Sequence, residues 1–187
     1  MKTHVFSAIR LTVVLLVVCC IVYPAFIWGI AYFTPSHGKG DTVEVNGKTV
    51  GYTLIGQSFT QDKYFNGRPS AVGYNAAGSG GSNKGPTNPE YLTSVQVAID
   101  TFLIKNSAVK RADIPVELVT ASASGLDPDI SPEAAYVQVP RIANVRGISE
   151  DKLKALVAQH IQGPLFGLFG PSKVNVLQLN ISLDHTK

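Results

Sequence analysis

The feature that most constrains this chain is an unbroken run of uncharged residues near its amino terminus. From Leu11 to Phe33, no Asp, Glu, Lys or Arg occurs across 23 positions. A helix rises about 1.5 Å per residue, so this run reaches roughly 34 Å and exceeds a hydrocarbon core of about 30 Å. Trp28 and Tyr32, in its second half, suit the far membrane interface. The sequence therefore predicts one transmembrane helix over residues 11–33.

Pro24 lies inside this run and is expected to kink the helix, because proline lacks an amide hydrogen and its ring clashes with the preceding turn. A neighbouring helix can accommodate such a kink by packing against the freed carbonyl, which indicates a partner within the membrane. We assign Leu11, Pro24, Trp28 and Phe33 to the membrane anchor.

Three other interpretations fit the apolar run less well. A cleaved signal peptide has a shorter apolar core and ends in a small-x-small cleavage pattern, which this run lacks. A lipoprotein signal needs a small residue before the cysteine, whereas Val18 precedes Cys19. A buried core helix of this length would be unusual in so small a domain. A transmembrane helix is therefore the interpretation that we adopt.

The charges on either side of the run predict its orientation. Lys2, Arg10 and the chain's amino terminus precede it, and the next charge after it is Lys39. Positive flanks stay in the cytoplasm, so residues 1–10 are expected there and residues 34–187 outside. We therefore expect a single-pass protein of the bacterial inner (plasma) membrane with a periplasmic main domain.

The charge balance and the cysteines exclude several classes of function. The formal net charge is +3, and Lys2 and Arg10 contribute two of these charges, so the remainder is close to neutral. This argues against a nucleic-acid surface, which needs a basic stripe. Cys19 and Cys20 both lie in the apolar run. The part that follows the run therefore cannot hold a disulfide or a cysteine-ligated metal, and we assign no metal site.

Beyond a linker at residues 34–41, residues 42–187 are expected to form one soluble domain. Asn46 and Gly47 separate two β-prone segments, and this pair favours the positive φ angles of a type I′ turn, so a β-hairpin is predicted. A loop rich in glycine, serine and asparagine follows, and it is long for a compact domain.

Three helices are predicted from their start signals. Asn88 is expected to cap a helix that runs to about residue 106, and Ser131 one that Pro140 should break or kink. Ser149 is expected to cap a helix over residues 150–161.

Two further segments are predicted as strands. Residues 115–120 resemble a short buried strand, and residues 177–183 alternate apolar and polar side chains with a period of two. The fold class predicted is a mixed α/β layer, in which apolar helix faces cover one side of a sheet.

The glycine-rich loop has two interpretations. Its backbone amides could approach an anion near the start of the helix capped by Asn88. However, no strand ends on the loop and no Walker motif occurs, so a turn-rich surface or docking loop is favoured. The residues concerned are Gly78, Ser79, Gly80, Gly81, Ser82 and Asn83.

Other candidate residues are acidic or basic side chains without a catalytic pattern. Asp127 and Asp129 could bind a cation or act as an acid/base pair, but a turn before the Ser131 cap is the favoured interpretation. The histidines are isolated in sequence and no Gly-x-Ser-x-Gly motif occurs, so only a Ser–His pair formed by folding stays open. No catalytic residue is assigned. The candidate docking residues are Arg68, Asp127, Asp129, Arg141 and Arg146.

Five segments, in order along nearly the whole chain, carry a family resemblance: residues 64–70, 77–83, 120–132, 138–143 and 174–180. Together with an apolar anchor in which Tyr23 precedes Pro24, they resemble the C subunit of the Kdp potassium-transporting ATPase. Ala123 stands where this family often has a glycine.

This resemblance implies a non-catalytic accessory subunit of a high-affinity, ATP-driven potassium importer. Its partners would be a channel-like potassium-binding subunit, a P-type ATPase subunit and a small helical subunit. The family is described as a catalytic chaperone that raises the ATP affinity of the ATPase subunit, and it is commonly labelled ATP-binding. By resemblance, a nucleotide would contact the glycine-rich loop, residues 78–83.

ATP is cytoplasmic, whereas the flanking charges place the folded domain outside. We therefore expect the domain to dock on the outer face of the potassium-binding subunit and to affect ATP affinity indirectly. No cofactor is expected in this chain, since the complex handles ATP and potassium. The alternatives are a direct ATP-binding module of that complex and an independent membrane-anchored periplasmic enzyme.

Overall fold

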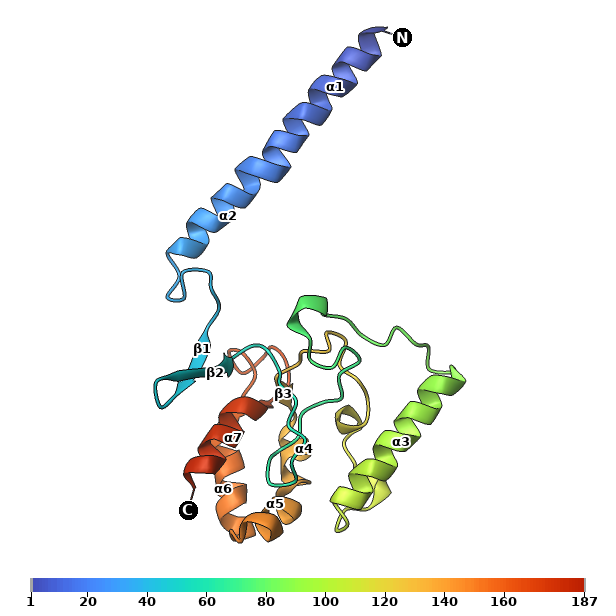
Figure 1. Ribbon diagram of the computed structural model, residues 1–187, viewed down its shortest axis with the longest axis vertical. Helices are drawn as coiled ribbons and strands as arrows, with labels where there is room; N and C mark the ends of the chain where they lie inside the picture. Colours follow the sequence, from blue (N-terminus) through green and yellow to red (C-terminus); the bar gives the residue numbers. More distant parts are fainter. Residues whose placement is uncertain (1, 187) are drawn as a thin grey trace. The chain divides into compact units, whose positions relative to one another are not determined.

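The computed structural model describes residues 2–186 (Figure 1). These residues form two compact units, of which the first ends at Asp41 and the second begins at Thr42. The first unit is a long helix followed by turns. It consists of α1 (Lys2–Val17), a π-helical turn (Val18–Val22) and α2 (Tyr23–Tyr32). The continuous segment His4–Tyr32 is long and apolar enough to cross a membrane, and it is wholly unburied within the chain.

The helix accommodates Pro24 by widening rather than by ending. The amide of Tyr23 donates to the carbonyl of Val18, five residues back, and this closes the π-helical turn immediately before the proline. Pro24 is then the second residue of α2, a first-turn position at which the missing amide hydrogen of proline is tolerated. Beyond the helix, Thr34 Oγ1 donates to the carbonyl of Ala31 at 2.7 Å and satisfies one of the last carbonyls.

The second unit opens with the predicted β-hairpin. Strands β1 (Thr42–Val45) and β2 (Lys48–Tyr52) pair antiparallel. The φ angles of Asn46 and Gly47 are 52° and 74°, as a type I′ turn requires. The hairpin prediction is confirmed.

A separate three-stranded sheet lies at the centre of the second unit. Its strands are very short: β3 (Asp129–Ile130), β4 (Ile161–Gln162) and β5 (Lys173–Asn175). The spatial order is β3-β5-β4, and both pairings are antiparallel. Together with the helices around it, this sheet confirms the mixed helix-and-sheet class, with one long apolar helix preceding a small α/β domain.

The three helices predicted from their start signals are present in the structure. Helix α3 (Pro89–Lys105) begins after Asn88, whose side chain accepts from the amide of Tyr91. After Ser131 come α4 (Pro132–Tyr136) and α5 (Val139–Arg146), and the chain breaks near Pro140 as expected. Helix α6 (Glu150–His160) follows Ser149, although the Ser149 side chain makes no capping hydrogen bond.

The strand predicted at residues 177–183 is wrong, since this segment lies within helix α7 (Val176–His185). Asn175 caps α7 by accepting from the amide of Gln178 at 3.1 Å. The apolar side chains repeat at every second position, but a subset recurs at spacings of three and four, which also fits a helix. Three of that subset are almost wholly buried: Val176, Leu179 and Leu183.

The strand predicted at residues 115–120 is also wrong, because Val116–Leu118 forms a 3₁₀ turn after Pro115. Leu118 turns into the core, whereas Val116 is 67% exposed. A short apolar run does not by itself distinguish a strand from a turn.

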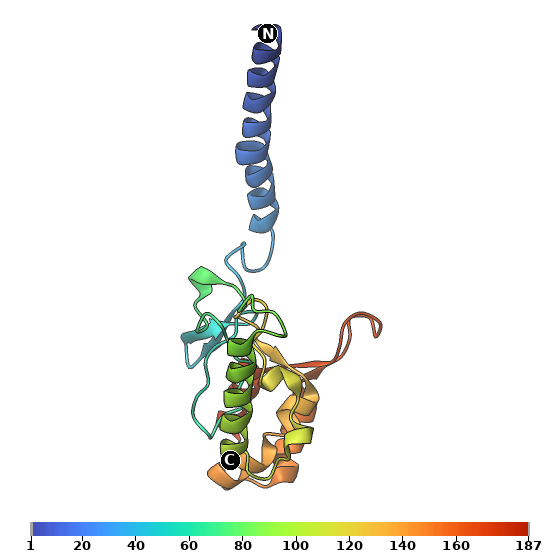
Figure 2. The same ribbon diagram turned by 90° about the vertical axis from the view of Figure 1, so that its right-hand side faces the viewer.

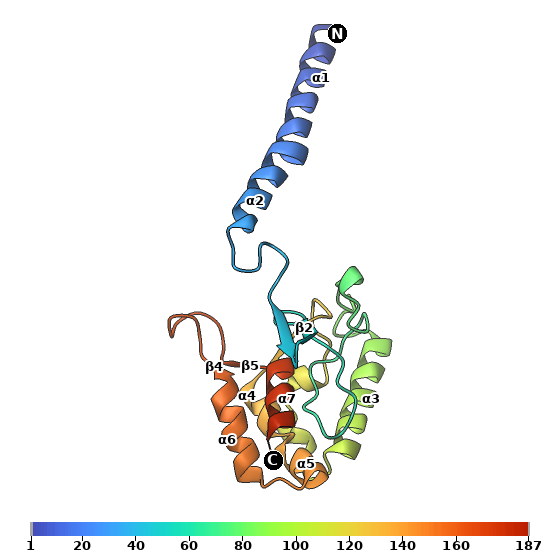
Figure 3. The same ribbon diagram turned by 60° about the vertical axis from the view of Figure 1, so that its left-hand side comes forward.

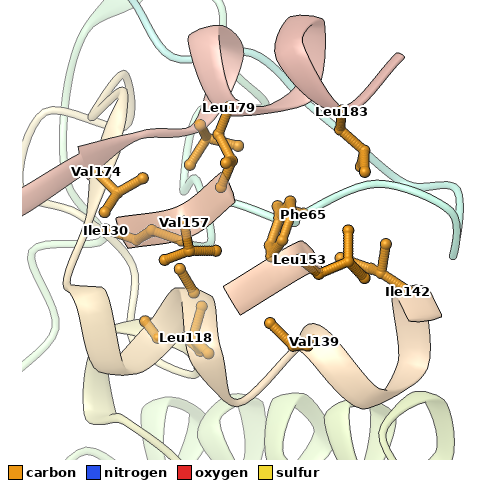
Figure 4. Packing of buried hydrophobic residues seen from close by; sticks show 13 residues of the cluster. Phe65, Leu118, Ile130, Val139, Ile142, Leu153, Val157, Val174, Leu179 and Leu183 are labelled. Carbon is orange, nitrogen blue, oxygen red and sulfur yellow. The ribbon is translucent and has the colours of Figure 1, made fainter. Parts of the chain in front are cut away.

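The core of the second unit lies between α4, α5, α6 and α7, with Phe65 at its centre (Figure 4). Phe65 comes from the long loop that follows the hairpin, and its side chain is wholly buried. Leu153 and Val157 reach it from α6, and Leu179 and Leu183 from α7. Full burial of such side chains stabilises the fold by about 1.5–3 kcal/mol each.

Candidate functional site

The glycine-rich loop packs against the segment over residues 120–132. The amide of Gly80 donates to the carbonyl of Ser124 at 2.8 Å, and Ser79 Oγ donates to the same carbonyl at 3.0 Å. The amide of Gly78 donates to the carbonyl of Asn75 at 3.0 Å. The amides of Gly78 and Gly80 are therefore bonded within the protein and are not available to an anion.

Two glycines of this contact are tightly packed: Gly81 has little room for a side chain and Gly125 has none. A Cβ on Gly81 would lie 3.1 Å from the carbonyl oxygen of Ala123. Gly125 has a φ of +67°, and a Cβ there would lie 2.5 Å from Val72 Cγ2 and 2.8 Å from the Gly80 oxygen. These glycines allow two loops to approach closely.

A third segment completes this arrangement. Ser70 Oγ donates to the carbonyl of Gly125 at 2.6 Å and accepts from the amide of Tyr74 at 2.9 Å. The Tyr74 hydroxyl donates to the carbonyl of Arg68. Burial raises the pKa of the Tyr74 hydroxyl, and the nearby charge of Asp127 raises it further. We call residues 68–74, 78–83 and 120–129 the loop cluster.

The two candidate carboxylates of the loop cluster belong to different ion pairs. Asp127 Oδ2 lies 3.1 Å from Arg68 Nη1, and Asp129 Oδ2 lies 2.6 Å from Lys173 Nζ. Asp127 Oδ1 also accepts from the amide of Asp129 at 3.1 Å, as in an Asx turn. Within residues 2–186, no group of three or more metal-ligand side chains forms.

Arg141 lies inside the domain and is only 7% exposed. Its guanidinium donates to Asn106 Oδ1 at 2.9 Å and to Gln138 Oε1 at 2.8 Å. It also donates to the carbonyls of Asp62 and Tyr64. Burial lowers its pKa, and the charge of Asp62 partly opposes that effect. Arg141 therefore joins α5, the end of α3 and the loop that carries Phe65.

Arg146 joins α5 to α7. Its Nη2 lies 2.7 Å from Asp184 Oδ1, and its guanidinium stacks over the Tyr64 ring at 5.0 Å. The Tyr64 hydroxyl donates to Asp184 Oδ2 at 2.9 Å. Burial and this bond to Asp184 raise the pKa of Tyr64, although Arg146 opposes them.

Folding does create one Ser–His pair. His160 Nε2 lies 2.8 Å from Ser182 Oγ, and His160 Nδ1 lies 2.8 Å from the carbonyl of Leu156. Ser182 is in the interior of α7, where backbone amides are engaged in the helix and cannot hold an oxyanion. The pair therefore joins α6 to α7 and lacks the surroundings that nucleophilic catalysis needs.

Helix α3 exposes large apolar side chains that no other part of residues 2–186 covers. None of its residues is fully buried. Val97 is 59% exposed and Ile104 is 82% exposed, and these residues, seven apart, share one face of the helix. Exposed Asp100 and Thr101 lie between them, so this face is mixed and not a continuous apolar patch.

A second apolar surface lies between the β-hairpin and α7, where a groove of about 480 Å³ is lined by Val50, Phe59, Leu177 and Ile181 among others. Tyr52 and Leu54, beside the hairpin, are 44% and 71% exposed.

The loop between β4 and β5 forms a third apolar surface, which was not predicted from the sequence. We call residues 163–170 the apolar tip. Leu165, Phe166, Leu168 and Phe169 are 64%, 84%, 79% and 66% exposed. The sequence contains a signal for this surface. One Leu-Phe pair lies between Gly163 and Gly167, and a second lies between Gly167 and Gly170.

Comparison with known proteins finds similarity over nearly the whole chain. The profile of the family described as "K+-transporting ATPase, c chain" matches residues 5–185. A protein of Flavobacterium psychrophilum named potassium-transporting ATPase KdpC subunit is 56% identical over 184 residues, covering 98% of this chain and 99% of its own length. A Bacteroides fragilis protein of the same name is 50% identical over 190 residues, covering 100% and 99%. A similarly named protein of Caldanaerobacter subterraneus is 48% identical over 184 residues, covering 98% and 95%.

Proposed function

Because the chain belongs to the family of K+-transporting ATPase C chains, the KdpC family, we propose that it is a non-catalytic accessory subunit of a high-affinity potassium importer. Its proposed partners are a channel-like potassium-binding subunit, a P-type ATPase subunit and a small helical subunit. Its proposed roles are assembly of the complex and an increase in the ATP affinity of the ATPase subunit. The complex, and not this chain, binds ATP and potassium.

The single observation that carries an indirect role is that two amides of the glycine-rich loop, those of Gly78 and Gly80, are bonded within the protein. The Gly80 amide and the Ser79 hydroxyl both donate to the Ser124 carbonyl. A phosphate cradle needs free amides that converge on the anion. An effect on ATP affinity would therefore be transmitted through subunit contacts, as a coupling free energy between distant sites.

The proposed topology supports the same conclusion. Lys2 and Arg10 lie at the amino-terminal end of the helix that is long enough to cross a membrane, and no Asp, Glu, Lys or Arg follows Arg10 before Lys39. We propose that this helix is a single-pass anchor in the bacterial inner membrane, with residues 1–10 cytoplasmic. The domain that begins at Thr42 would then be periplasmic and separated from cytoplasmic ATP.

We propose that α3 docks on the outer face of the potassium-binding subunit. Val97 and Ile104 are large apolar side chains that the described residues leave exposed, with Asp100 and Thr101 between them. Each Å² of apolar surface buried at this contact would stabilise the complex by about 25 cal/mol. The core of the domain would stay unchanged.

Reporter fusions after Lys187 test the topology. A reporter that is active only in the periplasm should be active in this fusion, and a cytoplasmic reporter should be inactive. The opposite result would favour a direct ATP-binding module.

ATP binding tests the mechanism. The purified full chain in detergent should not bind ATP, and the complete complex should show the same KM for ATP with Gly80→Ala as without it. A Cβ at Gly80 meets only Val72 Cγ1 at 3.9 Å, so this substitution fits the fold. A higher KM in the variant would instead place the nucleotide at this loop.

Removal of the chain tests the accessory role. A complex that lacks it should lose potassium-stimulated ATP hydrolysis at low ATP and recover part of it at high ATP. Hydrolytic activity of the chain by itself, with unchanged transport in its absence, would support an independent enzyme.

A further inference from the structure

The apolar tip combines exposed apolar side chains with a complete lack of charge. Leu165, Phe166, Leu168 and Phe169 are all more than half exposed. No Asp, Glu, Lys or Arg occurs from Ile161 to Ser172. Figures 2 and 3 show this loop standing away from the body of the second unit. A soluble surface rarely presents four large apolar side chains at the end of a projecting loop, so the tip is built for an apolar environment.

The backbone of the tip bonds to itself. The amides of Leu165 and Phe169 each donate to the other's carbonyl, at 2.9 and 3.0 Å. The amide of Gly167 donates to the carbonyl of Pro164, and the amide of Leu168 to that of Leu165. Positive φ angles at Phe166 and Gly167 close this tight turn. In an apolar medium an unpaired backbone group is costly, so internal pairing suits insertion into lipid.

The tip lies at the end of the second unit through which the chain enters. In all three ribbon views, the start of β1 and the tip lie towards the same end of this unit, with α5 at the other end. Residues 33–41 are all that separate the last helical residue of the anchor, Tyr32, from Thr42. Nine residues span at most about 30 Å. The covalent linker therefore limits how far Thr42, at the entry end, can lie from the end of the anchor.

We propose that the apolar tip inserts into the interfacial layer of the same bilayer that holds the anchor, as a second membrane contact. This inference rests on the anchor spanning a bilayer, which is part of the proposed function. The anchor gives the tip a high effective concentration at the membrane, so weak insertion suffices. A convex tip without charged groups suits a fluid apolar layer better than a specific protein surface, which needs polar contacts for orientation.

Tryptophan quenching in the full chain tests the proposal. The chain's single tryptophan, Trp28, is replaced by Phe, and Phe166→Trp is added. The matched control adds Val145→Trp instead, on α5 at the opposite end of the domain, where Val145 is 52% exposed. Both proteins are placed in vesicles containing brominated lipid and are also studied within the complete complex. Aqueous acrylamide serves as the second quencher.

We expect brominated lipid to remove most of the emission of the Phe166→Trp protein, and acrylamide to remove most of that of the Val145→Trp control. Adding Phe169→Asp should reverse the quenching at the tip without changing thermal unfolding, since Phe169 is exposed. Acrylamide quenching at the tip without lipid quenching would overturn the proposal. Protection from both quenchers, seen only in the complex, would overturn it in favour of a protein partner.

The wild-type chain separates failure of this inference from failure of the proposed function. Trp28 should be quenched by brominated lipid if the anchor is inserted. If Trp28 is quenched and the tip is not, only the inference about the tip fails. If Trp28 is not quenched, the proposed membrane anchor fails, and the inference fails with it.

Discussion

The side chain of Asn180 pairs with both backbone groups of Phe65, which is 115 residues away in sequence. The Phe65 amide donates to Asn180 Oδ1 at 2.8 Å, and Asn180 Nδ2 donates to the Phe65 carbonyl at 2.9 Å. Gln138 repeats this arrangement one residue later: it accepts from the Asn66 amide at 2.8 Å and donates to the Asn66 carbonyl at 3.1 Å. These two buried side-chain amides therefore supply the hydrogen bonds that a neighbouring strand would otherwise give to the backbone of this loop.

Asn180→Leu should destabilise the domain strongly, because it leaves the buried amide and carbonyl of Phe65 without partners. Each unpaired group costs about 1–3 kcal/mol. Thermal unfolding of the full chain in detergent measures the loss. The control is Asn144→Leu at an exposed position of α5, which should change stability by less than about 0.5 kcal/mol. Equal effects of the two changes would contradict this account.

Gly125→Ala should separate the three segments of the loop cluster. Its left-handed φ costs a residue with a Cβ about 1–2 kcal/mol, and the contact with Val72 Cγ2 adds about 1–3 kcal/mol of overpacking. Limited proteolysis should then cut within residues 78–83. Gly85→Ala is the matched control, since a Cβ there meets nothing within 4 Å. That variant should be as resistant as the wild type, and cleavage of both would refute the prediction.

Tyr74→Phe should reduce the loss of stability in alkali. The pKa of Tyr74 is raised in the folded protein, chiefly by burial, so the neutral phenol is the form that folding favours. Its contribution is fully present below a pH of about 10, the ordinary pKa of tyrosine, and is lost as the pH rises through the folded pKa.

The variant should be less stable at neutral pH by about 1 kcal/mol, since the hydroxyl no longer donates to Arg68. Its melting temperature should then fall less steeply as the pH rises above about 10, the ordinary pKa of tyrosine. Parallel curves for the two proteins would show that Tyr74 does not couple ionisation to folding.

Val97→Asp and Ile104→Asp should weaken docking without unfolding the domain. Both side chains are largely exposed, so each change should alter stability by about 0.5 kcal/mol or less. A carboxylate buried at a subunit contact is costly, so recovery of the partner subunits with the tagged chain should fall. Val145→Asp makes the same change on α5 and should leave recovery unchanged. Full recovery with both α3 variants would remove α3 from the docking surface.

Local signals in the sequence predicted the elements that depend on a few neighbouring residues. Asn46 and Gly47 fix the hairpin turn, and Asn88 fixes the start of α3. The long apolar run predicted a helix over residues 11–33. The structure has a continuous helical segment over His4–Tyr32, with a π-helical turn before Pro24. These features need no information about the rest of the fold.

Features that depend on distant contacts were not predictable. Leu179 and Leu183 fit both a strand and a helix, and only packing against α6 and Phe65 decides for α7. The predicted roles at the site have a similar limit. Sequence alone could not show that Arg141 lies inside the domain or that Arg68 pairs with Asp127. Docking by the exposed candidates stays a prediction.

The π-helical turn has a consequence for how the anchor meets its neighbours. A π turn holds one residue more than an α turn, and one residue corresponds to about 100° of rotation. Side chains of residues 4–17 and of Tyr23–Tyr32 are therefore out of phase with one another by roughly that angle. A stripe drawn at helical spacing on the first half does not continue along the second. One helix can thus offer two contact stripes that point in different directions. In a crosslinking scan, the helical periodicity should therefore be fitted separately for each half.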